Sequence, residues 1–150
     1  GYESQDDLDA MPELFARMEE VRLEAGRRMG LGDVKKMVVP KIGLIAAPTG
    51  AGHFAARYFM PWSTHPTLAV TGSQCLAACA LAPGTVAEGL VRTIGPSPVT
   101  LVIEHPMGTM DVNVTYEREP FAFVSAGVTR TARLIARGEV MVPRAVWERL

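Results

Sequence analysis

The spacing of apolar residues changes along the chain, and each spacing predicts a different kind of element. A helical spacing is kept by Met11, Leu14, Phe15, Met18 and Val21. It predicts an amphipathic helix over residues 11–29, with Asp9 as its capping residue and Pro12 in its first turn. We expect this helix to pack on a core, and a partner-binding helix is the alternative.

Shorter runs rich in β-branched and aromatic residues predict strands. They cover residues 34–48, 54–60, 99–105, 110–116 and 121–131. The third and fourth runs flank the short segment PMGT, which predicts a hairpin. Most neighbouring strands are therefore expected to run antiparallel.

An uncharged segment lies among these strands. Residues 73–82, SQCLAACALA, are apolar on nearly every side, and a helix that is apolar all round is buried. Pro83 and Gly84 end it. The pattern predicts a helix enclosed by the sheet with only its N-terminus open, where free backbone N–H groups form an anion site.

Composition limits the function classes. The chain has 150 residues, is 48% hydrophobic and has a formal net charge of -1. It is long enough for one domain with a core, whereas a nucleic-acid partner would require a basic face. No apolar run reaches the ~20 residues of a membrane-spanning helix. Nucleic acid and membrane are therefore excluded as partners.

The two cysteines, Cys75 and Cys79, lie four residues apart. On a helix they would share a face, in a geometry that makes a mutual disulfide unfavourable. A second pair of ligands for a metal is missing, and the histidines are scattered. We therefore expect a reduced, cytoplasmic protein without a bound metal.

Several motifs together resemble one family. They are HPTLAVTGSQCLAACALAPGTV, HPMGTMDVNV, VTRTARLIARGEVMVP, EEVRLEAGRRMGLGD and VPKIGLIAAP. In this order they are similar to the second half of the PrpF-type proteins. These comprise 2-methylaconitate cis-trans isomerases, 4-oxalomesaconate tautomerases and methylitaconate isomerases.

The resemblance implies a diaminopimelate-epimerase-like fold. The expected class is α+β, a single domain over residues 1–150 with a leading helix in 1–32. In residues 37–150, a curved, mostly antiparallel, barrel-like sheet wraps around a central apolar helix. The family binds a small unsaturated polycarboxylic acid between two such domains and moves a proton without a cofactor.

The resemblance also implies what is missing. Family members have two domains, and their catalytic cysteine and lysine lie in the first, which matches nothing here. In related epimerases a second-domain cysteine precedes the central helix, and Ala69 occupies that place in this sequence. The missing first domain, or a second copy in a homodimer, is therefore an expected partner.

The main candidate site residues lie at the N-terminus of the predicted central helix. Thr71, Gly72, Ser73 and Gln74 are expected to bind a carboxylate through N–H groups and hydroxyls, with ordinary capping as the alternative. Cys75 is the candidate acid or base, because a helix N-terminus favours a thiolate. For this residue the alternative is a small apolar packing group.

Three more residues could contact the substrate. His65 precedes the helix, Lys41 lies on a predicted strand, and His105 begins the hairpin turn. Each has a plain alternative: a structural hydrogen bond for His65, a solvated side chain for Lys41, and loop capping for His105.

Two functions remain open at this point. One is an isomerase or tautomerase domain that acts on aconitate-like acids and is incomplete or inactive alone. The other is a non-catalytic domain that binds a small anion or self-associates.

Overall fold

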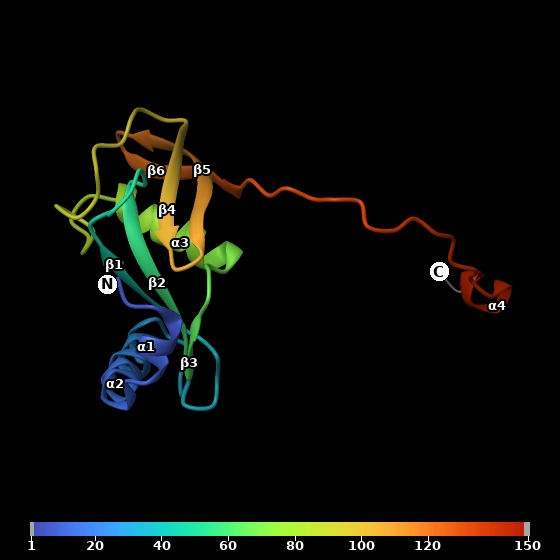
Figure 1. The fold of residues 1–150 in the computed structure, drawn as a ribbon, viewed down its shortest axis with the longest axis horizontal. Helices are drawn as coiled ribbons and strands as arrows, with labels where there is room; N and C mark the ends of the chain where they lie inside the picture. The colour runs from blue at the N-terminus through green and yellow to red at the C-terminus, as the bar shows by residue number, and fades with distance from the viewer. Residues whose placement is uncertain (1, 149–150) are drawn as a thin grey trace.

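A computed structural model describes residues 2–148, and Figure 1 labels the elements that they form. In chain order these are α1 (Gln5–Asp9), α2 (Pro12–Arg28), β1 (Ile42–Ala46), β2 (Phe54–Met60), β3 (Ser63–His65), α3 (Val70–Leu81), β4 (Val99–His105), β5 (Gly108–Arg118), β6 (Phe121–Val128) and α4 (Arg144–Trp147). None of the helices in this described part combines the length and apolar character that crossing a bilayer requires.

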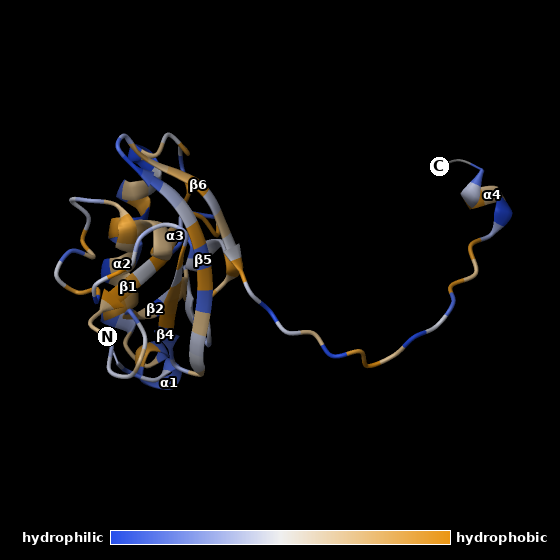
Figure 2. Ribbon diagram, turned by 90° about the horizontal axis from the view of Figure 1, so that it is seen from above, coloured by the Kyte–Doolittle hydropathy of each residue, from blue (hydrophilic) through white to orange (hydrophobic). Residues whose placement is uncertain are grey.

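The strands form one sheet in the order β1-β2-β4-β5-β6, with β3 paired to β2. All pairs are antiparallel except β2 and β4, which are parallel and joined over a short register beginning at Phe54 and Ile103. The sheet curls around α3 as a half-barrel (Figure 2). The predicted α+β class and curved, mostly antiparallel sheet around a central helix are confirmed.

Strand β2 lies at the centre of the packing. On one face Phe54, Ala56 and Tyr58 join the core beneath α3. On the other face Phe59 packs with Leu8 of α1 and with α2. A strand covered on both faces has a nearly continuous apolar sequence, which explains why this segment lacks alternation.

Helix α3 is buried on one face rather than on all sides. Gly72, Ser73, Leu76 and Ala77 are buried, while Cys75 on the opposite side is exposed. The helix packs against β4, β5 and β6, and Tyr58 of β2 packs on Gly72, while Val70, Thr71 and Cys75 are exposed. The expected complete enclosure is therefore wrong, because the sheet is a half-barrel and leaves one side of the helix open.

Helix α2 buries part of the predicted stripe, since Leu14, Phe15 and Met18 pack on the core. Met11 and Val21 are instead 41% and 58% exposed, and Arg22 and Gly26 are buried in their place. The predicted capping by Asp9 is also wrong. The N-cap is Met11, without a side-chain bond, and the Asp9 carboxylate instead accepts the N–H of Thr64 at 2.7 Å.

Two predicted strands are shorter than expected. Within residues 34–48 only Ile42–Ala46 forms β1, since residues 34–41 form a turn and irregular backbone. The last predicted strand ends at Val128, and residues 129–148 are all exposed. In Figure 1 this C-terminal segment extends away from the sheet and ends at α4.

Candidate functional site

An open cavity of about 550 Å³ flanks the first two turns of α3. It lies between this helix, strands β1 and β2, and the segment that follows α2. The lining residues are Met29, Leu31, Val39, Pro40, Lys41, Gly43, Tyr58, Thr71, Gly72, Cys75 and Leu76. The structure therefore brings four residues predicted from the sequence, Lys41, Thr71, Gly72 and Cys75, to one cavity.

The start of α3 determines which backbone N–H groups are free. The helix begins at Val70, three residues earlier than predicted, with Ala69 as N-cap. The N–H of Ser73 donates to the Ala69 carbonyl at 2.8 Å, and the Ser73 hydroxyl donates to the Val70 carbonyl at 2.8 Å. The free N–H groups are therefore those of the first turn, at Val70, Thr71 and Gly72.

Three predicted residues on α3 have different surroundings. Ser73 is fully buried, and Gln74 Nε2 donates to the Ala126 carbonyl of β6 at 2.9 Å. Cys75 is exposed on the wall of the cavity, whereas Cys79 is half-buried one turn further on. Of the two thiols, only that of Cys75 lines this cavity, where a ligand can reach it.

Tyr58 was not among the predicted residues, yet its ring forms part of the cavity wall. A Cβ atom on Gly72 would lie 2.4 Å from Tyr58 Cζ, so the ring packs directly on the helix backbone. Burial raises the pKa of Tyr58, and a negative charge on Cys75 acts in the same direction. The Lys41 ammonium lies 6.0 Å from the centre of the ring.

His65 lies beside Tyr58 rather than on the cavity wall. The two residues are paired across β2 and β3, and their rings meet edge to face at 6.1 Å. His65 Nδ1 accepts the N–H of Thr67 at 3.1 Å. The imidazole therefore supports the ring of Tyr58 and orders the segment before α3.

His105 lies outside this cavity. It ends β4, and its Nδ1 accepts the N–H of Met107 at 3.2 Å, which is the loop-capping geometry of the alternative interpretation. Burial lowers the pKa of His105, and the charges of Arg130 and Arg57 lower it further, against an opposing effect of the Thr109 backbone. His105 lines a separate cavity of about 330 Å³ beside Arg57.

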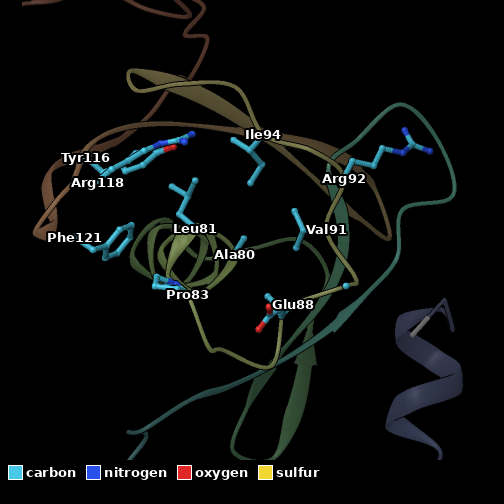
Figure 3. Close-up of a pocket in the computed structure, with 12 residues that line it drawn as sticks. Ala80, Leu81, Pro83, Glu88, Val91, Arg92, Ile94, Tyr116, Arg118 and Phe121 are labelled. Carbon is cyan, nitrogen blue, oxygen red and sulfur yellow. The ribbon is translucent and has the colours of Figure 1, made fainter.

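A third open cavity, of about 450 Å³, lies at the C-terminal end of α3 (Figure 3). Leu81 of the helix, Tyr116 of β5 and Phe121 of β6 contribute to its wall, and Arg92 points away from it. None of the predicted site residues lines it. Within residues 2–148 no cluster of three or more His, Cys, Asp or Glu side chains is arranged to hold a metal ion.

Comparisons with known proteins agree on one family. The family model described as PrpF protein matches residues 1–143. A 4-oxalomesaconate tautomerase of Pseudomonas putida is 38% identical over 147 residues, which cover 98% of this chain and 40% of that protein. A (4E)-oxalomesaconate Delta-isomerase of Novosphingobium sp. (strain KA1) is 39% identical over 142 residues, with coverages of 95% and 40%.

A solved structure shows the same fold. The crystal structure of methylitaconate-delta-isomerase matches with a TM-score of 0.71 and 22% sequence identity. The match covers 86% of this chain and 40% of that one. The chain therefore spans about 40% of the length of the relatives it matches.

Proposed function

This chain belongs to the PrpF family, and from that premise we propose that it is a domain of a cofactor-independent isomerase or tautomerase. Its substrate class is small unsaturated polycarboxylic acids related to aconitate. The observation that carries the proposal is the convergence of Lys41, Thr71, Gly72 and Cys75 on one cavity at the start of α3.

The groups in this cavity divide into binding and chemical roles. The free N–H groups of the first turn of α3 and the positive end of its dipole hold one carboxylate. The Lys41 ammonium supplies a second positive charge at the same cavity. In this proposal the Cys75 thiol takes or returns a proton next to the bound acid.

A proton shift also requires a second acid–base group, because one group removes the proton and another returns it at a different carbon. In the described part of the chain, Cys75 is the candidate thiol at this cavity, and Lys41 is assigned to binding. We therefore propose that a second domain or a second copy of this chain supplies the missing acid–base group. The isolated chain then turns over little or no substrate.

The binding site is tested by titrating the chain with cis-aconitate and mapping amide chemical shifts. We expect the largest shifts at residues 70–75 and Lys41. Ser73→Ala should weaken binding only about two-fold, since the Ser73 hydroxyl already donates within the helix. Gly72→Val should abolish binding, because its side chain displaces the ring of Tyr58. Shifts gathered at the cavity of Figure 3 would contradict the site.

A second candidate function is a non-catalytic domain that binds an anion or self-associates. The exposed segment of residues 129–148 favours it, because unpaired apolar residues invite another chain. Both functions predict little or no turnover of 4-oxalomesaconate by the isolated chain, so any turnover would favour the catalytic function. Turnover by the pure chain that Cys75→Ser abolishes would refute the proposal that the chain is inactive alone.

A further inference from the structure

The phenol of Tyr58 stands apart from the other tyrosine hydroxyls. Tyr2 Oη donates to the Ala47 carbonyl at 2.9 Å, and Tyr116 Oη donates to Gly95 at 3.4 Å. Tyr58 is only 7% exposed, yet within residues 2–148 its Oη forms no hydrogen bond. Among the described residues, the buried side-chain atom without a hydrogen bond is Thr64 Oγ1, so Tyr58 Oη keeps contact with solvent on a side chain that lines the open cavity beside α3. A donor that the fold leaves without a partner at a cavity is available to a ligand.

The position of this hydroxyl is set from three sides. Strand β2 places the side chain on the concave face, in register with His65 of β3. His65 contacts the ring edge to face, which holds it against α3. At Gly72 a Cβ would lie 2.7 Å from Tyr58 Oη, so the absence of a side chain there lets the hydroxyl reach the first turn of the helix.

The hydroxyl is therefore held beside the free N–H groups of α3, at the edge of the cavity that also contains Lys41. The phenol, the first-turn N–H groups and the Lys41 ammonium are all donors at the same cavity, and the matching ligand group is a carboxylate with several acceptor positions. Burial raises the pKa of Tyr58, so the phenol stays protonated at neutral pH and acts as a donor.

We propose that Tyr58 is a ligand-binding residue whose Oη donates a hydrogen bond to the carboxylate held at the start of α3. This inference rests on the proposed function and adds to it a side-chain donor that supplements the backbone. It also explains why position 72 is glycine, since any Cβ there would displace the phenol.

Tyr58→Phe tests the inference, because it removes only the hydroxyl and keeps the ring contact with His65. We expect the Kd for cis-aconitate, measured by titration calorimetry, to rise about 10-fold or more, as for loss of a hydrogen bond to a charged group. The melting temperature of the unliganded chain should not fall, since no intramolecular bond is lost. A purely structural tyrosine would instead lower the melting temperature.

Tyr116→Phe is the matched control. Tyr116 has the same exposed fraction of 7% but lies at the other end of α3, in the cavity of Figure 3. Removal of the Tyr116 hydroxyl should leave the Kd for cis-aconitate unchanged. A measurement that needs no variant is the ring chemical shift of Tyr58 in the wild-type chain, which should move on binding more than those of Tyr2 and Tyr116.

The outcomes separate the two proposals. If the wild type binds at residues 70–75 but Tyr58→Phe binds equally well, the role of Tyr58 is refuted and the proposed site stands. If cis-aconitate does not bind the wild type, or binds elsewhere, both are refuted.

Discussion

Arg22 is the buried charge that organises the N-terminal part of the chain. It is 1% exposed, and its guanidinium donates to the carbonyls of Val34, Met37 and Val39 at 2.8–3.1 Å. Its Nε also pairs with Glu19 at 2.6 Å, and this bond raises the pKa of Arg22. One side chain thereby fixes the segment between α2 and β1, which forms one wall of the cavity.

Arg22→Ala should lower the free energy of unfolding by about 3 kcal/mol, because it leaves buried carbonyls and Glu19 without a partner. Urea unfolding followed by circular dichroism measures this. The exposed Arg17 of the same helix is the control, and Arg17→Ala should change stability by less than about 0.5 kcal/mol. Equal effects of the two variants would show that Arg22 does not hold this segment.

At the scale of elements, Glu104 at the end of β4 orders the loop between β1 and β2. Its carboxylate accepts the N–H groups of Thr49, Gly50 and Gly52 at 2.8–2.9 Å. Burial alone would raise the pKa of Glu104, but these N–H groups outweigh it and hold the pKa below 4.5. The carboxylate is thus stabilised in the folded state.

A carboxyl group with a lowered pKa stabilises the fold above its unfolded pKa, near 4.5, and this stabilisation is lost as pH falls through the folded value. Glu104→Gln should therefore cost about 1–2 kcal/mol at pH 7 and progressively less below pH 4.5. Urea unfolding at both pH values checks this, with the exposed Glu117→Gln as control. A cost that does not depend on pH would contradict the role of the charge.

Elements defined by local pattern were predictable, and those held by distant contacts were not. The runs 54–60 and 99–105 match β2 and β4 at both ends. By contrast, α1 and β3 stabilise each other: Gln5 Nε2 donates to the Thr64 carbonyl, and Asp9 accepts the Thr64 N–H, across more than fifty residues. No local pattern contains those bonds.

The candidate site divides in the same way. The motif at the start of α3 was visible in the sequence, and Lys41 lines the same cavity as Thr71, Gly72 and Cys75. Tyr58 was not found, because only the close approach of β2 to Gly72 brings its hydroxyl to this place. The available signal was the Tyr58 hydroxyl, the single polar group on the otherwise apolar inward face of β2.

At the scale of the whole molecule, the unpaired parts are the open edge of the sheet and the C-terminal segment. Strand β6 pairs with β5 on one side, and most of its residues are exposed. Beyond it, Leu134, Ile135, Val140 and Met141 are 80–94% exposed. Helix α2 offers a smaller apolar surface to another chain, because Phe15 already packs on Phe59.

The apolar side chains of the segment 130–142 follow a nearly alternating pattern. Five of its seven even-numbered positions are apolar, Ala132, Leu134, Ala136, Val140 and Val142, and Arg133 and Arg137 occupy odd-numbered ones. Ile135 and Met141 interrupt the alternation. This is the pattern of a strand with one buried face, yet the segment is exposed along its whole length. A strand pattern without a partner next to an open sheet edge favours pairing with another chain.

We therefore expect the 150-residue chain to self-associate through the segment 130–142 and the open edge of β6. Light scattering at micromolar concentration should show a dimer. Deletion of residues 130–148 should give a monomer whose far-ultraviolet circular dichroism spectrum still shows an intact sheet. Val21→Glu, on the exposed side of α2, tests the alternative helix interface and should leave the dimer intact. A wild type that stays monomeric would refute association, and dissociation by Val21→Glu alone would assign the interface to α2 instead.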